Sequence, residues 1–141
     1  MNYISEDEFL NQSSEVQEVF INWWNPSAGD LFYIDGINEL QVVAKSTIDS
    51  FGDDDFVKFK KGCIPLLVEG QLRQFIEDTT GGKLEIYPYS IYDNCDFSFI
   101  IRDAGCYGDD PQGISAENIF EAYWKISLKV ANDYLEKELE K

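Results

Sequence analysis

Clustered carboxylates are the side chains in this sequence that could do chemistry. The 141 residues include 27 aspartates and glutamates but no histidine. The runs Asp53-Asp54-Asp55 and Asp109-Asp110 offer the oxygen ligands that Mg²⁺ and Ca²⁺ take. Neither run has the spaced Asp-x-Asp-x-Asp-Gly pattern of a calcium loop, and runs of like charge are usually solvated. We expect no metal and no other cofactor, with a divalent-metal-dependent enzyme using these clusters as an alternative.

Nucleophilic catalysis lacks its usual partners in this chain. Without histidine no Cys–His or Ser–His pair can form, and no G-x-S-x-G, Walker A or G-x-G-x-x-G motif is present. Cys63, Cys95 and Cys106 have no C-x-x-C spacing. A strand at 97–101 would hold Cys95 and Cys106 too far apart for a disulfide. We therefore predict free thiols and a protein that is not an enzyme.

The negative charge is concentrated in parts of the sequence. The formal net charge is −16, and residues 1–44 contain eight acids and no lysine or arginine. Residues 84–110 contain six acids against Arg102 alone. This balance argues against direct binding to nucleic acid or to a membrane, because both attract basic side chains. Two explanations stay open: a surface that keeps the protein soluble, or one that docks on a basic region of another protein.

A docking surface of this kind would use the acids of the negative stretches and of the Asp runs. Its candidate residues are Glu6, Asp7, Glu8, Glu15, Glu18, Asp30, Asp53, Asp54, Asp55, Asp109 and Asp110.

Trp23-Trp24 is the most conspicuous aromatic pair. Neighbouring helical residues point about 100° apart, so the two indoles cannot face one direction. Trp23 continues the stripe of Val16 and Phe20 and is expected in the core. Trp24 is expected at the margin of that stripe or exposed. An exposed Trp24 would be an aromatic anchor at a protein interface, where tryptophan is enriched.

The elements that position these residues begin with helices. Ser5-x-x-Glu8 and Ser14-x-x-Gln17 both fit the capping box that starts a helix. The second helix is expected to end before Asn25-Pro26, because proline disfavours a helical conformation in the residue before it.

A meander of strands follows, at residues 31–34, 40–44 and 56–60, the last with apolar and polar residues alternating. A short middle helix is predicted over 69–78, and Gly81-Gly82 is expected to end it.

Two further strands, at 83–89 and 97–102, precede the clearest element, a helix from Ala116 to about Leu139 capped by Ser115. Its apolar stripe is wide enough to lie across a sheet. The predicted fold is α+β over a single domain, residues 1–141, in which helices pack on a mainly antiparallel sheet of about five strands. The helix could also dimerise through this stripe, so an oligomeric regulatory or structural component is a further alternative. The protein could therefore be a monomer or a dimer.

The start of the chain has neither a basic region nor an apolar stretch, and no apolar run approaches the roughly 18–20 residues of a membrane span. We therefore expect a cytoplasmic protein.

Several strings resemble a family of small proteins from phages and prophages of low-GC Gram-positive bacteria. They are Met1–Glu6, Trp23–Pro26 followed by Gly29-Asp30, Ile64–Glu77 and Ala122–Trp124. The resemblance carries over no catalytic or binding residue. It implies an accessory protein in the cytoplasm of the bacterial host that binds a host or phage protein with a basic surface. Small acidic phage proteins often inhibit host systems that handle nucleic acid, so the resemblance also implies an acidic nucleic-acid mimic.

Overall fold

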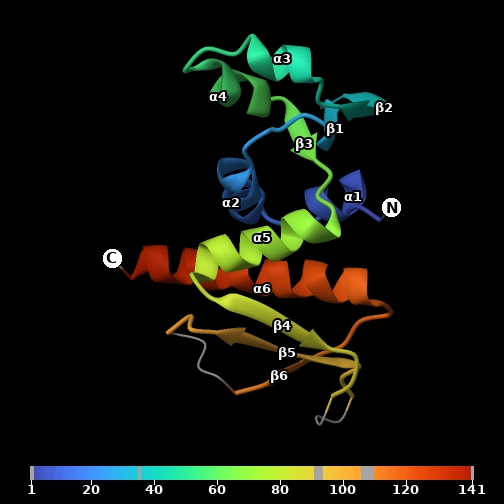
Figure 1. The fold of residues 1–141 in the computed structure, drawn as a ribbon, viewed down its shortest axis with the longest axis vertical. Helices are drawn as coiled ribbons and strands as arrows, with labels where there is room; N and C mark the ends of the chain where they lie inside the picture. The colour runs from blue at the N-terminus through green and yellow to red at the C-terminus, as the bar shows by residue number, and fades with distance from the viewer. Residues whose placement is uncertain (1, 35, 91–93, 106–109, 141) are drawn as a thin grey trace. The chain divides into compact units, whose positions relative to one another are not determined.

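The chain folds into two compact units, Tyr3–Val68 and Glu69–Lys141, called the N-terminal and C-terminal units below (Figure 1). The computed structural model describes residues 2–34, 36–90, 94–105 and 110–140. Among these residues no helix is long and apolar enough to cross a membrane. The expectation of a single domain over residues 1–141 stays a prediction.

The N-terminal unit combines short helices with one antiparallel sheet. Its strands have the order β2-β1-β3, so β1 is central. In the register of the sheet, Phe32 of β1 lies opposite Gln41 of β2 and Pro65 of β3. The elements are α1 (Glu6–Leu10), α2 (Ser14–Trp23), β1 (Leu31–Ile34), β2 (Ile37–Val42), α3 (Lys45–Asp49), α4 (Asp55–Lys60) and β3 (Cys63–Pro65).

The strand predicted at residues 56–60 is wrong, because these residues belong to α4. Phe56 and Phe59 are three residues apart, so the helix places both on one side, where both rings contact Phe51 at centroid distances of 4.9 and 5.5 Å. Alternation over five residues fits a short strand and a helical turn about equally. The third strand of the sheet is Cys63–Pro65 instead.

One predicted capping box is confirmed, and the other helix start is shifted by one residue. The N–H of Glu8 donates to Ser5 Oγ at 3.1 Å, and the Ser5 N–H donates to the Glu8 carboxylate at 3.2 Å. In α2 the N-cap is Ser13 rather than Ser14, since the Val16 N–H donates to Ser13 Oγ at 3.2 Å. Either serine can supply a capping oxygen, so the sequence pattern alone does not choose between them.

The C-terminal unit packs two helices on a second antiparallel sheet. The sheet has the order β4-β5-β6, and Figure 1 shows α5 running along α6 on one side of it. The described residues thus form two three-stranded sheets, so the α+β class is confirmed and the single sheet of about five strands is wrong. The elements are α5 (Glu69–Thr80), β4 (Lys83–Tyr87), β5 (Phe97–Arg102), β6 (Gln112–Ile114) and α6 (Ile119–Leu139).

The long C-terminal helix carries the predicted apolar stripe. Tyr123 and Ile126 are buried in it. The helix begins later than expected, because Asn118 rather than Ser115 is its N-cap and accepts a hydrogen bond from the Glu121 N–H at 2.8 Å.

Gly81-Gly82 ends α5 as predicted. Gly81 adopts a φ of +78°, which favours glycine, and its N–H donates to the Glu77 carbonyl at 2.9 Å. A Cβ at Gly82 would lie 2.5 Å from the backbone oxygen of Arg102. The backbone at Gly82, in the link between α5 and β4, therefore lies so close to β5 that any residue with a Cβ would clash there.

Candidate functional site

The structure divides the predicted acidic surface between the two units. Asp110 is exposed just before β6 in the C-terminal unit, and Asp109 lies outside the described residues. The other nine residues belong to the N-terminal unit: Glu6, Asp7, Glu8, Glu15, Glu18, Asp30, Asp53, Asp54 and Asp55.

Carboxylates on α1 and α2 form the exposed part of this set. Asp7, Glu8, Glu15 and Glu18 are exposed, and we call these four residues the acidic α1–α2 surface. Glu15 and Glu18 are three residues apart on one face of α2, so their charges are neighbours. Glu6 is half-buried, so it is not counted in this surface. Three residues link the two helices, which keeps all four carboxylates close along the chain.

The Asp30 carboxylate forms hydrogen bonds within the N-terminal unit and has a structural role there. Its carboxylate accepts hydrogen bonds from the Trp24 indole N–H at 3.0 Å and from the Ser27 N–H at 2.9 Å. Both bonds fix the turn between α2 and β1. Asp30 is half-buried, so we remove it from the candidate surface.

The exposed aromatic anchor predicted at Trp24 is wrong. Its side chain is only 2% exposed and lies 6.5 Å from the ring of Phe32 and 6.1 Å from that of Phe59. The prediction assumed that both tryptophans are helical, but α2 ends at Trp23 and Trp24 has an extended backbone. The 100° rule therefore does not apply to Trp24, which turns into the core while Trp23 is half-buried.

A lysine that sequence analysis did not single out caps α2. Lys60 Nζ donates to the backbone oxygens of Trp24 at 2.8 Å and of Asn22 at 3.5 Å. A cation at the carboxyl end of a helix is favourable because the last carbonyls have no partner within the helix. Partial burial lowers the pKa of Lys60. No local signal marks this contact, since Lys60 and Trp24 are far apart in the sequence.

The two units hold their charge differently. Each has a formal net charge of −8, from twelve acids and four lysines in the N-terminal unit and fifteen acids and seven bases in the C-terminal unit. Within the described residues, no carboxylate of the N-terminal unit forms an ion pair with a lysine or arginine. Ion pairs of the C-terminal unit join Arg73 to Glu77 (3.5 Å), Lys83 to Glu77 (3.9 Å), Arg102 to Glu85 (2.7 Å), Lys125 to Glu121 (3.0 Å) and Lys129 to Asp133 (3.3 Å).

The most elaborate of these pairs lies across β4 and β5. Arg102 Nε donates to one carboxylate oxygen of Glu85 at 2.7 Å, and the Tyr87 hydroxyl donates to the other at 2.5 Å. The hydrogen bond from Arg102, followed by that from Tyr87, lowers the pKa of Glu85. The Glu85 carboxylate is thus occupied within its own sheet.

The aspartate run at the start of α4 does not gather into a metal site. Asp53 is exposed, Asp54 is the helix N-cap, and the Asp55 carboxylate accepts a hydrogen bond from the Gly52 N–H at 2.6 Å. Across the part of the chain that the structure describes, no three cysteine, aspartate or glutamate side chains are placed to hold a metal ion.

The Cys63 thiol is not set up as a nucleophile. Cys63 and Cys95 are free, and Cys106 lies outside the described residues. Cys63 is buried and its thiol donates to the Phe59 carbonyl at 3.0 Å. Burial raises the pKa of Cys63 to about 11, so the reactive thiolate is scarce at neutral pH.

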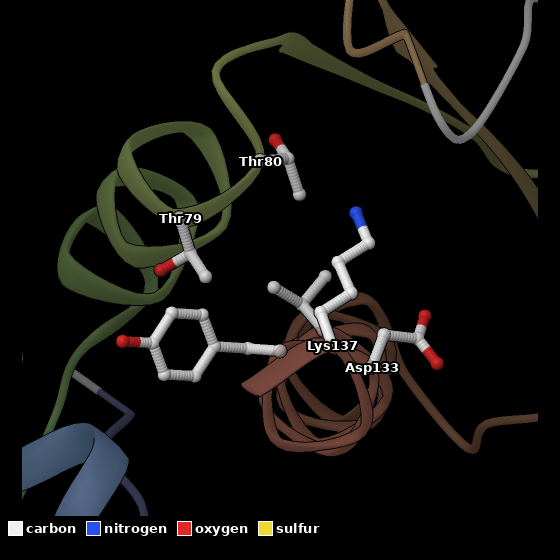
Figure 2. A pocket seen from close by; sticks show the side chains of 6 residues that line it. Thr79, Thr80, Asp133 and Lys137 are labelled. Carbon is white, nitrogen blue, oxygen red and sulfur yellow. The ribbon is translucent and has the colours of Figure 1, made fainter. Parts of the chain in front are cut away.

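A hollow between the ends of α5 and α6 holds about 50 Å³ (Figure 2). Two of its polar side chains have partners within the unit: Thr80 Oγ1 donates to the Ile76 carbonyl at 2.7 Å, and Asp133 pairs with Lys129. Sites for small organic ligands usually measure roughly 300–1,000 Å³, so this hollow is too small for one. Its lining residues are Thr79, Thr80, Val130, Asp133, Tyr134 and Lys137.

Comparison with known proteins found no relative of this chain. No protein-family model, no curated protein and no solved structure matches it. The charge and geometry of the two units are therefore the basis on which a role is proposed.

Proposed function

We propose that the protein is a non-enzymatic accessory protein that binds a basic surface of another protein through its acidic α1–α2 surface. The observation that carries the proposal is that these four exposed carboxylates have no cationic partner in the described residues. A basic partner would supply the missing charge. Complementary charge of this kind speeds association and fixes the partner's orientation, and added salt weakens it.

The partner class that fits is a host or phage protein that handles nucleic acid in the bacterial cytoplasm. DNA presents one negative charge per roughly 1.7 Å of helix axis, so proteins that bind it have dense basic surfaces. An unpaired acidic surface can occupy such a site as a nucleic-acid mimic.

The two alternatives have less support. A divalent-metal-dependent enzyme would need a cluster of ligands, and the described residues hold none. An oligomeric component was predicted to dimerise through the stripe of α6, but Tyr123, Ile126 and Val130 of that stripe are buried within the C-terminal unit.

Charge reversal on matched pairs of glutamates tests the proposal. Glu15→Lys with Glu18→Lys changes the acidic α1–α2 surface. Glu136→Lys with Glu140→Lys makes the same change in charge on an exposed residue of α6 and on its exposed C-cap. Proteins bound from a bacterial lysate are compared by quantitative mass spectrometry at low and high salt. We expect a basic, nucleic-acid-handling protein to be retained by the wild type and the α6 variant, and lost with the α2 variant and at high salt. Recovery of no basic protein, or equal recovery by all three proteins, would contradict the proposal.

A further inference from the structure

The edge strand β2 presents apolar side chains to solvent. In the described residues β2 is paired with β1 on one side only. Ile37, Leu40 and Val42 are 47%, 46% and 57% exposed. An unpaired strand edge offers a row of backbone donors and acceptors to any extended chain.

The other sheet edges of the described residues lack this combination. Pro65 in β3 has no N–H to offer, and β3 is buried. The edge of β4 carries the charged residues Lys83 and Glu85, and β6 has only three residues. Short strands, proline and charges are the usual protection of sheet edges. In β2, which has six residues, Glu39 is the one charged residue.

We propose that β2 binds an extended segment of a basic partner protein, which adds to the sheet as a further strand. The inference rests on the proposed function and names the form in which the partner binds. Backbone hydrogen bonds along the strand supply affinity, and alternate side chains supply specificity.

The side chains of β2 define the segment that fits. The pairing of β2 with β1 is regular at Gln41 and Val42 and shifts between Gln41 and Ile37, and the side chains of Leu40 and Val42 are both exposed. A segment that alternates aliphatic residues with lysine or arginine would cover Leu40 and Val42 and place a cation near Glu39. Pairs across neighbouring strands interact in this way, both apolar and of opposite charge.

Charge also favours a basic partner over a second copy of this chain. Residues 1–44 contain eight acids and no base, and a second copy would bring the same unpaired charge to the edge. Like charges placed together disfavour such a pairing. A basic segment would instead reduce the repulsion within the N-terminal unit.

A defined peptide tests the inference on the full chain. The peptide has nine residues that alternate valine and lysine, and a second version has alternate backbone amides N-methylated. Binding is measured by fluorescence anisotropy at low salt. We expect the plain peptide to bind and the methylated one to bind at least about tenfold more weakly, because methylation removes the donors that pair with a strand edge.

Matched variants locate the binding site. Leu40→Lys places a charge on β2, and Val57→Lys places the same charge on α4, where Val57 is 56% exposed. We expect Leu40→Lys to weaken the peptide about tenfold and Val57→Lys less than about twofold. Leu40→Thr, which introduces an uncharged β-branched residue suited to a strand, should give an intermediate loss if Leu40→Lys disturbs the hairpin.

Several outcomes would overturn the inference. They are no binding of the plain peptide, equal binding of the two peptides, and equal losses for Leu40→Lys and Val57→Lys. A dimer in sedimentation velocity that Leu40→Lys dissociates would assign the edge to a second copy. If Glu15→Lys with Glu18→Lys weakens the peptide and Leu40→Lys does not, strand addition fails while the proposed function stands.

Discussion

The N-terminal and C-terminal units carry the same formal net charge of −8, and they arrange it differently. In the C-terminal unit, Glu77, Glu85, Glu121 and Asp133 form ion pairs with nearby bases, as in the pair of Arg102 with Glu85 at 2.7 Å. In the N-terminal unit all four lysines lie within residues 45–61, and no described carboxylate pairs with any of them. Net charge alone therefore does not show which acids are available to a partner. The pairing within the fold does.

Core substitutions give the largest expected effect and test whether each unit has a core of its own. Phe20 and Phe75 are both 0% exposed, one in each unit. Phe20→Ala and Phe75→Ala should each lower the free energy of unfolding by about 3–5 kcal/mol, because each leaves a cavity. Hydrogen exchange should show protection lost first in the unit that carries the substitution. Equal loss throughout both units from either variant would contradict a separation into two cores.

The Trp24–Asp30 hydrogen bond gives the next largest effect, and it is specific to the N-terminal unit. Trp24→Phe keeps a buried ring but removes the indole donor, which should lower the free energy of unfolding by about 1–3 kcal/mol. Urea denaturation followed by circular dichroism measures it. Asp30→Asn keeps an acceptor oxygen and should lose less. A loss below about 0.5 kcal/mol for Trp24→Phe would show that this bond does not hold the turn.

Neutralising one acid in each unit should change the free energy of unfolding by different amounts and in opposite directions. Glu77 is 13% exposed, accepts the Leu84 N–H at 2.9 Å and pairs with Arg73, so Glu77→Gln should lower the free energy of unfolding by about 1–2 kcal/mol. Glu18 is exposed without a cationic partner, so Glu18→Gln should change stability by less than about 0.5 kcal/mol, on the stabilising side. Thermal and urea unfolding of both variants provide the measurement. Destabilisation by Glu18→Gln as large as that by Glu77→Gln would remove the distinction between the units.

The last expected effect is a pH dependence of the N-terminal unit that is absent at neutral pH. Burial raises the pKa of Cys63 to about 11, whereas an unfolded thiol titrates near about 8.5. Between these values the unfolded chain releases a proton that the folded chain keeps, so stability should fall as the pH rises through this window. Cys63→Ala should flatten the fall in unfolding free energy between about pH 8.5 and 11. Identical slopes for wild type and Cys63→Ala would contradict this.

Local signals in the sequence predicted much of the fold. The capping box at Ser5, the glycine pair at Gly81-Gly82 and the stripe of α6 depend on residues near one another in the chain, and all three are confirmed. The strand predicted at residues 56–60 failed because five alternating residues also fit a helical turn, in which Phe56 and Phe59 pack on Phe51. The single sheet of about five strands failed because the pairing of strands joins segments that are distant in the chain.

The candidate site was predictable only in part, for the same reason. Composition located the acidic stretch, since residues 1–44 have no base. Whether an acid is paired depends on where the lysines lie in the fold, and Lys60 binds the end of α2 rather than a carboxylate. Trp24 was misplaced because the helix ends one residue before it. The open edge at β2 became visible only once the order of the strands was known.

Nuclear magnetic resonance titration of the ¹⁵N-labelled chain tests the central claim most directly, because it reports on both units at once. The titrant is a nine-residue peptide of lysine alone, which lacks the aliphatic side chains that would cover Leu40 and Val42 of β2, added at low and then at high salt. The unpaired charge of the N-terminal unit predicts shift changes in the amides of α1 and α2 that disappear at high salt, with little change in α6. Equal changes in the amides around the paired acids of α6, or no change in α1 and α2, would contradict the claim that the N-terminal unit holds the available charge.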